Sequence, residues 1–305
     1  FSVAVMTGMA EDRTQALIAN ESSHIQIHHS KYLANHEPEY RISDAEDLTA
    51  RLKKNESFQA AARRIKINAM ASSSAGSNAA VYINGINPLQ EKQLTEIYKH
   101  INDSAGNYFE ADFSNPAVIG EKLAKTLKMN RFKITRLSSD YLKKHGVPDK
   151  LIKKTEKIEG IYFRRYHQFK DSLTKIIGPE AYNTHEYFIK ESAEYFTQNN
   201  KIVLTFMDKQ GQQTGAVFRV CGIYNTDNTG FDALNIFVKH SDLERISGYR
   251  INKPHEIAVL LKDKEKSAAL AEKLQKNYPD LSIRSWQKIN PEVGFLSEYI
   301  DFYNY

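Results

Sequence analysis

The sequence is short of cysteine and of long apolar runs, and it lacks the common signatures of nucleotide and acyl chemistry. Its 305 residues include one cysteine, Cys221, so neither an internal disulfide nor a cysteine-based metal site can form. No stretch approaches the roughly 20 apolar residues that cross a bilayer. No Gly-x-x-x-x-Gly-Lys-Ser/Thr loop occurs, so any ATPase must be another chain. The run at 72–77 lacks the spacing of a nucleophile elbow.

The charge balance excludes one class of partner. Lys and Arg number 42 and Asp and Glu 37, which gives a net charge of +5. Both signs alternate through most of the chain, whereas nucleic-acid binders concentrate basic residues in a stripe. We therefore expect no nucleic-acid partner. The length favours two domains, and the hydrophobic content of 41% is ordinary for a folded protein.

Candidate catalytic and metal-binding residues are few. Cys221 lies in the apolar run 217–224, which predicts a buried strand thiol and not a nucleophile. His24 and His28 share one face of a predicted strand, and His29 points to the other. We interpret them as surface histidines, because the sequence identifies no further ligands. We therefore expect no catalytic residue, no cofactor and no metal.

Both ends of the sequence are apolar or amphipathic. The first nine residues read FSVAVMTGM and the last thirteen VGFLSEYIDFYNY, unlike the polar, poorly ordered ends of most soluble domains. There is no initiator Met and no signal peptide. We expect a piece cut from a membrane protein, with one membrane span finishing near Met9 and another beginning just beyond Tyr305.

Hydrophobic periodicity predicts an α+β fold in which both chain ends build one domain. The elements expected at the ends are a helix at 11–20, a strand at 23–28, a helix at 44–62 capped by Ser43, a strand at 64–70, and then a strand at 255–261, a helix at 264–278 and a strand at 281–286. Two such β-α-β units would form one split domain near the membrane.

The middle of the chain predicts a mixed β domain inserted into the first. Its expected elements are a strand and turn at 80–88, helices at 89–101 and 116–128, strands at 132–137, 202–206, 216–224 and 234–238, and a short helix at 241–246. Residues 138–200 interrupt it with a Lys-rich helical segment, which Gly178 and Pro179 break into at least two helices.

The helical insertion is dense in aromatic residues and supports two interpretations. Tyr and Phe at helical spacing usually pack into a local core. The same residues beside arginines also match the composition of an interface. The candidate surface for docking a partner or substrate comprises Tyr162, Phe163, Arg164, Arg165, Tyr166 and Phe169.

Several short stretches, taken in order, resemble one family of membrane proteins. They are 5–9 (VMTGM), 81–88 (VYINGINP), 106–109 (GNYF), 118–127 (VIGEKLAKTL), 220–226 (VCGIYNT), 231–232 (FD), 236–238 (IFV) and the run from Trp286 to Tyr305. Their order and spacing resemble the extracytoplasmic domain of ABC transporter permeases in the group of macrolide exporters, lipoprotein-releasing permeases and the cell-division permease. The resemblance covers nearly the whole chain except 138–200.

The resemblance implies a membrane-proximal porter-like domain at 21–72 and 252–290 and a distal sabre-like domain at 73–251. It implies stalks at 1–20 and 291–305. Such a region lies on the periplasmic side of the inner membrane and is not an enzyme. It would couple ATP hydrolysis by a cytoplasmic ATP-binding subunit to export or release of lipoproteins, peptides or hydrophobic compounds.

The resemblance also implies partners and coupling residues. The expected partners are the ATP-binding subunit, a second permease copy or paralogue, and a periplasmic adaptor or carrier protein. On the second stalk, Phe295, Leu296 and Tyr299 would carry motion into the head.

This sequence departs from the family in two places. Residues 130–132 read NRF where a Gly-Asp pair is usual, and the connection at 207–215 is too short for the hook that recruits a carrier. The short connection weakens the expectation of carrier recruitment. The resemblance to the cell-division branch of the family implies an alternative, a regulatory module that recruits and activates a cell-wall hydrolase. A free-standing enzyme is a third, which no set of nucleophile and base supports.

Overall fold

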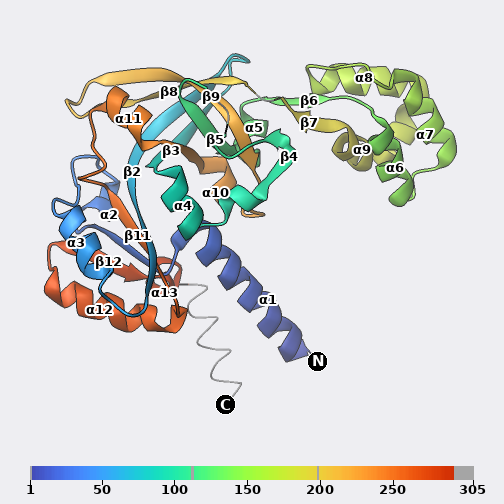
Figure 1. The fold of residues 1–305 in the computed structure, drawn as a ribbon. Helices are drawn as coiled ribbons and strands as arrows, with labels where there is room; N and C mark the ends of the chain where they lie inside the picture. Colours follow the sequence, from blue (N-terminus) through green and yellow to red (C-terminus); the bar gives the residue numbers. More distant parts are fainter. Residues whose placement is uncertain (1, 111–112, 198, 292–305) are drawn as a thin grey trace.

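One strand, β2 (Phe58–Ser73), runs through both halves of the body. The computed structural model describes residues 2–110, 113–197 and 199–291. The first half of β2 pairs antiparallel with β11 (Glu256–Leu261). From Ile65 onward it pairs instead with β3 (Asn78–Ile86). A single extended segment therefore belongs to two sheets (Figure 1).

The first sheet is built from segments near both chain ends, in the order β12-β1-β11-β2. Its strands β1 (Ile25–His29) and β12 (Leu281–Ser285) pair antiparallel, as do β1 and β11. We call it the end sheet. Its apolar side chains pack with those of α3 (Ala45–Leu52) and α12 (Ser267–Asn277) in one core. The core includes Ile25, Ile27, Leu48, Leu52, Ile257, Val259 and Ala271.

The second sheet closes on itself. Its strands follow the order β2-β3-β10-β5-β9, and β8 joins β9 back to β2. Its further strands are β10 (Asn235–Lys239), β5 (Pro116–Gly120), β9 (Gln213–Tyr224) and β8 (Lys201–Met207), with β4 (Ile101–Gly106) added on β9. The β10–β3 and β5–β9 pairs are parallel. The result is a six-stranded mixed barrel, and the predicted α+β class is confirmed.

Short helices surround the barrel. They are α4 (Pro88–Leu94), α5 (Glu121–Thr126), α10 (Thr229–Leu234) and α11 (His240–Ser247). The barrel core is a large cluster that includes Ile65, Ile67, Ile83, Ile119, Leu204, Phe218 and Val238. Along β8, burial alternates from Ile202 to Phe206. The apolar side chains of this strand therefore point into the barrel.

A helical arm projects from the barrel (Figure 1). Its base is a two-stranded ribbon of β6 (Asn130–Phe132) and β7 (Glu194–Phe196). Its helices are α6 (Arg136–Lys144), α7 (Asp149–Thr155), a 3-10 turn (Glu156–Ile158), α8 (Tyr166–Ile177) and α9 (Pro179–Ala193). The predicted break is confirmed, because Gly178 has a φ of +88° between α8 and α9.

One helix projects separately from the body. Helix α1 (Ser2–Leu17) continues into a π-helix, Ile18–Ser22, which leads to β1 (Figure 1). The chain leaves β12 through α13 (Trp286–Ile289), and α2 (Tyr32–Asn35) follows β1. Within the described residues, no helix is both long and apolar enough to cross a bilayer. The predicted second stalk, with Phe295, Leu296 and Tyr299, lies outside the described residues.

Several predicted elements were wrong. The helix predicted at 44–62 ends at Leu52, because Phe58 begins β2 and pairs with Leu261. Asp44, and not Ser43, is its N-cap. The helix predicted at 116–128 begins only at Glu121, since Pro116–Gly120 is the fully buried strand β5. In both cases long-range strand pairing overrides a helical pattern.

Two further helix and strand limits were wrong. The helix predicted at 89–101 is α4 followed by a 3-10 turn, Ile97–His100. The strand predicted at 132–137 is confined to β6, since Thr135 caps α6 in a reciprocal pair with Ser138.

Candidate functional site

The base of α1 is fixed to both halves of the body. Ile18 packs with the buried Trp286 of α13, with Leu17 beside them. The backbone N–H of Glu96 donates to the Ala19 carbonyl at 2.8 Å, which ties the π-helix to the barrel side. Asn228, the N-cap of α10, donates through its amide to the Glu21 carboxylate at 2.5 Å. The base of α1 therefore contacts both halves of the body.

A buried charge cluster joins the end sheet to the barrel. The Arg64 guanidinium on β2 binds Glu91 of α4 at 2.6 Å and 3.2 Å, a two-bond arrangement. It also binds Glu256 of β11 at 2.6 Å, and Lys66 reaches the same carboxylate at 3.0 Å. Burial alone would raise the pKa of Glu256, but Lys66 and Arg64 hold it well below its usual range. The cluster is satisfied internally, so it holds the two sheets together.

Sequence reasoning missed this cluster. Arg64 and Lys66 alternate along β2 in the way that solvated strand residues do, and Glu91 and Glu256 lie 27 and 192 residues away from Arg64. Only the strand register, which pairs Glu256 with Arg64, brings these charges together. No signal in a single sequence reveals that pairing.

His24 and His28 are core residues, so their interpretation as surface residues was wrong, whereas His29 is only partly buried. His24 is 8% exposed and His28 is 2% exposed. The Leu261 N–H donates to Nδ1 of His24 at 2.9 Å, and burial lowers the pKa of His28 to about 4. No group of three or more His, Cys, Asp or Glu suited to a metal ion occurs among the described residues.

Cys221 is a core thiol, as predicted. It is 3% exposed on β9, and its Sγ lies 3.3 Å from the Ala117 carbonyl. Burial raises the pKa of the thiol, which keeps it protonated and poorly nucleophilic.

The residues of the predicted docking surface do not all lie on a surface. Tyr162 is 51% exposed, and Arg164 and Arg165 are exposed in the turn before α8. Phe169 is fully buried, so its predicted place on a docking surface is corrected: its ring stacks on Phe132 with centroids 5.4 Å apart. It belongs to the core of the arm, with Leu142, Ile152, Leu173, Tyr182 and Ile189.

Phe163 and Tyr166 lie between these two environments. Both are partly buried against the core of the arm. The Tyr166 hydroxyl donates to Glu186 at 2.5 Å and lies 3.0 Å from the Tyr182 hydroxyl. Each interpretation of the aromatic insertion therefore holds for some of its residues. Phe169 packs into the core of the arm. The proposed docking surface is reduced to Tyr162, Arg164 and Arg165, with the exposed parts of Phe163 and Tyr166.

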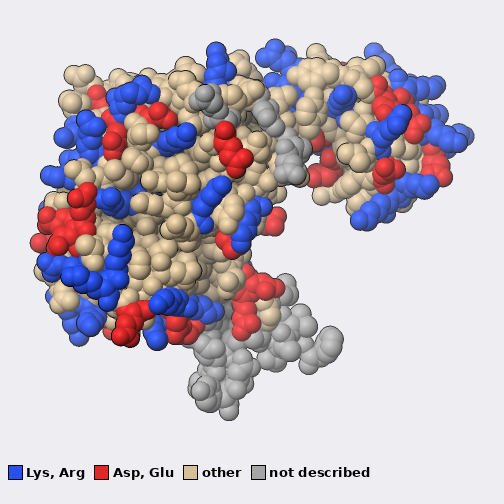
Figure 2. Space-filling model, viewed as in Figure 1, with Lys and Arg blue, Asp and Glu red and all other residues tan. Residues whose placement is uncertain are grey.

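The net positive charge of the protein lies on the arm. Residues 130–196 carry fourteen Lys and Arg against nine Asp and Glu, a net charge of +5, which equals that of the whole chain. The rest of the chain is therefore balanced. Figure 2 shows Lys and Arg spread over the visible face of the arm. An arm with this charge attracts anionic partners over about the 8–10 Å range of screened electrostatics.

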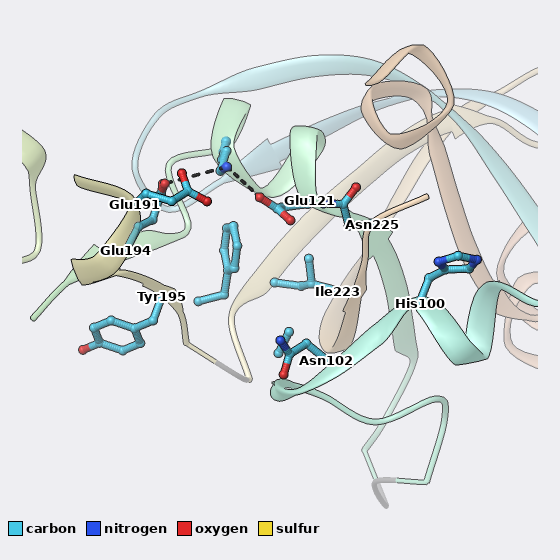
Figure 3. Close-up of a pocket in the computed structure, with 11 residues that line it drawn as sticks. His100, Asn102, Glu121, Glu191, Glu194, Tyr195, Ile223 and Asn225 are labelled. Carbon is cyan, nitrogen blue, oxygen red and sulfur yellow. Dashed lines mark ion pairs between the residues drawn. The ribbon is translucent and has the colours of Figure 1, made fainter. Parts of the chain in front are cut away.

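Two cavities flank the junction of arm and barrel. The first, of about 220 Å³, is lined by residues that include Glu121, Glu191, Glu194 and Asn225 (Figure 3). Dashed lines in Figure 3 mark the ion pairs from Lys125 to Glu121 at 2.6 Å and to Glu194 at 3.7 Å. Glu121 and Lys125 both lie on α5, and the Lys125–Glu194 pair joins this helix to β7 at the base of the arm. The second cavity, of about 770 Å³, includes Arg164 and Arg165 in its lining.

The comparisons with known proteins give matches to solved structures. No family model matches the chain, and no curated protein sequence matches it. The solved structures that it resembles include extracytoplasmic domains of ABC-type transporters, the class that the sequence motifs resemble.

One is the extracellular domain of the noncanonical ABC-type transporter YknZ from Gram-positive bacteria, with a TM-score of 0.42 and 12% identity over 86% of this chain and 99% of that one. Another is the periplasmic region of MacB from Actinobacillus actinomycetemcomitans, with a TM-score of 0.41 and 11% identity over 91% of this chain and 95% of that one.

Proposed function

We propose that this chain is the extracytoplasmic head of an ABC transporter permease and that its role is mechanical. The observation that carries the proposal is the anchorage of α1. Its base contacts Trp286 of the end sheet, Glu96 beside the barrel and Asn228 of α10. The sequence motifs of the permease family support the same role. In this role the head is not an enzyme and holds no cofactor.

The proposed cycle begins in a separate cytoplasmic ATP-binding subunit. Nucleotide binding there draws the membrane helices together, and α1 passes the movement into the end sheet. The Arg64 cluster and the shared strand β2 carry it on to the barrel and arm as a rigid-body motion. Two facing heads would then expel or release lipoproteins, peptides or hydrophobic compounds already outside the inner membrane, with or without an adaptor or carrier.

The test follows the arm during nucleotide turnover. A spin label on a cysteine at Tyr187, which is 69% exposed on α9, measures the distance between two heads in the full-length permease. The native Cys221 is buried and leaves the label specific. We expect ATP with vanadate to change this distance. Trp286→Ala, which opens the contact with Ile18, should abolish the change while ATP hydrolysis stays within about twofold of wild type.

Two further variants make the result interpretable. Removal of a buried Trp costs about 3–5 kcal/mol, so Trp286→Phe, which keeps most of the ring contact, should retain both folding and the distance change. Leu137→Ala, at a 79% exposed position on the arm, is the matched control. An unchanged distance response in Trp286→Ala, or a native polypeptide that purifies without any ATP-binding subunit, would overturn the proposal.

The projecting arm favours one alternative function. An arm of about sixty residues with its own core and charge offers a surface for a protein that the head recruits, such as a cell-wall hydrolase. The alternative predicts that the full-length permease activates a bound hydrolase, and that deletion of residues 133–193 abolishes activation but not ATP hydrolysis. Under the transport proposal, a hydrolase would neither copurify nor respond.

A further inference from the structure

The second cavity at the base of the arm is lined by basic residues. It lies between the end of α5, the strand β6 and the start of α8. The β2–β3 turn at Ser74 and Ala75 forms one side of it. Its basic lining residues are Lys125, Lys128, Arg131, Arg164, Arg165 and His167. No Asp or Glu lies among the described residues that line it. A cavity of one sign concentrates the field and favours a ligand of the opposite sign.

Most of these charges have no counter-charge among the described residues. Lys125 is neutralised by Glu121 and Glu194. In the part of the chain that the structure describes, Lys128, Arg164 and Arg165 form no ion pair and their side chains are exposed. Four guanidinium or ammonium groups, counting Arg131, therefore surround one cavity with their charge available.

Arg131 is the most informative of the four. It is 9% exposed, and its guanidinium donates to the backbone carbonyls of Lys128 and Asn130 at 2.9 Å and 2.8 Å. Its Nε donates to the Tyr162 hydroxyl at 3.0 Å. Neutral oxygens orient the group, but no carboxylate in the described residues balances its charge. A buried cation without a counter-ion is costly, and a bound anion would supply the missing charge.

Helix α8 contributes a second, independent feature. The helix has twelve residues and begins at Tyr166, and both Tyr166 and His167 line the cavity. Its N-cap residue Arg165 makes no side-chain capping hydrogen bond. The first N–H groups of the helix and the positive end of its dipole are therefore available to an anion.

We propose that this cavity binds the phosphate group of an organic or lipid phosphate. Guanidinium groups match two phosphate oxygens at once, a geometry that lysine alone does not provide. Tyr166, which is partly buried, borders the same cavity and gives the non-phosphate part of the ligand an aromatic wall. The proposal does not depend on the transport role, since the site lies entirely within this chain.

Titration calorimetry with inorganic pyrophosphate tests the site in the 305-residue chain. We expect saturable binding, and Arg164→Gln with Arg165→Gln should weaken it about tenfold or more, because charge-assisted hydrogen bonds are lost. Both arginines are exposed and outside the core, so folding should be retained. Lys143→Gln with Lys144→Gln on α6 makes the same change in net charge at exposed positions of the arm and should stay within about twofold of wild type.

Vesicle flotation distinguishes the source of the phosphate. Binding to vesicles that contain phosphatidic acid, but not to pure phosphatidylcholine vesicles, assigns a lipid phosphate, provided that the arginine variant abolishes it. Binding of pyrophosphate alone assigns a soluble phosphate. The proposal is overturned if neither probe binds, or if the lysine control loses as much affinity as the arginine variant, because binding would then reflect general charge.

Discussion

At the scale of single residues, burial fixes the protonation of His255. This side chain is fully buried at the junction of the two sheets. Its Nδ1 accepts the Lys66 N–H at 3.1 Å, and its Nε2 donates to the Pro38 carbonyl at 2.8 Å. Both nitrogens are satisfied only in the neutral ring. Burial lowers the pKa of His255 to about 4.

This protonation state predicts a loss of stability in mild acid. Between pH 6.5 and 4 the unfolded chain takes up a proton on His255 and the folded chain does not, so the free energy of unfolding falls as the pH falls. The contribution of His255 is on the order of 2 kcal/mol over this window. Urea unfolding followed by circular dichroism at several pH values measures it.

Substitution of His255 separates its effect from other titrations. His255→Gln can accept from Lys66 and donate to Pro38 without titrating, so the pH slope above pH 4.5 should become shallower. The buried His28, whose pKa is also lowered to about 4, keeps its own share of the slope. Below that pH, Glu256 adds its own loss, because its folded pKa is held low. His167→Gln, at an exposed position, should leave the slope unchanged. An equal slope in wild type and His255→Gln would contradict the assignment.

At the scale of elements, the turn from β5 into α5 depends on close contact with α10. Gly120 is the last residue of β5 and the N-cap of α5. A Cβ added to it would lie 2.1 Å from the Asp232 carbonyl oxygen of α10. The backbone of α10 cannot shift as easily as a flexible side chain could. Only glycine at position 120 therefore allows β5 and α10 to come this close.

Gly120→Ala should therefore destabilise the barrel by about 2–3 kcal/mol, the upper part of the range of ~1–3 kcal/mol that is usual for forced overpacking. The measurement is the midpoint of urea unfolding. Gly230→Ala, within α10 itself, is the matched control: its added Cβ meets only the Asn228 side chain at 3.4 Å, and its effect should stay within about 1 kcal/mol. A Gly120→Ala protein as stable as wild type would show that α10 can move away.

Elements with unambiguous periodicity could be predicted from the sequence. The hairpin of β8 and β9 and the strands β10, β11 and β12 alternate or form short apolar runs, and these predictions are confirmed. Residues 58–62 and 116–120 contain alanines and other residues compatible with either state. Their strand partners lie far along the chain, so the local pattern could not decide their conformation.

The candidate site was only partly predictable for the same reason. The dipeptide Arg164-Arg165 is visible in the sequence as part of a candidate surface. Arg131 and Lys128 are thirty or more residues earlier, and the backbone hydrogen bonds between Phe132 and Phe163 bring β6 beside the start of α8. The burial of Phe169 likewise depends on how four helices pack, which spacing alone does not specify.

At the scale of the whole molecule, the arm and the barrel have separate cores. The cluster around Phe169 and Tyr182 shares no buried residue with the barrel cluster. The short ribbon of β6 and β7 and the ion pair of Lys125 with Glu194 join the arm to the barrel. The arm can therefore lose its structure without the barrel doing so.

Phe169→Ala should unfold the arm selectively. Removal of this ring costs about 3–5 kcal/mol, which a unit of about sixty residues with one small core cannot absorb. Hydrogen exchange read by peptide mass spectrometry should show lost protection in α6, α8 and α9 and unchanged protection in β2, β9 and β11. Phe163→Leu, at a half-buried position of the same arm, should keep its protection. Uniform loss across the chain would mean one cooperative unit.

The sixteen residues of β2 span about 50 Å at the usual rise of a strand. Two sheets that share one strand cannot rotate relative to each other unless the hydrogen bonds along one side of that strand break. A rotation of the end sheet would therefore be passed on to the barrel. The arm, which projects from the barrel, would then move through a larger distance than the end sheet. The continuity of β2 would thus turn a small displacement of the end sheet into a larger displacement of the arm.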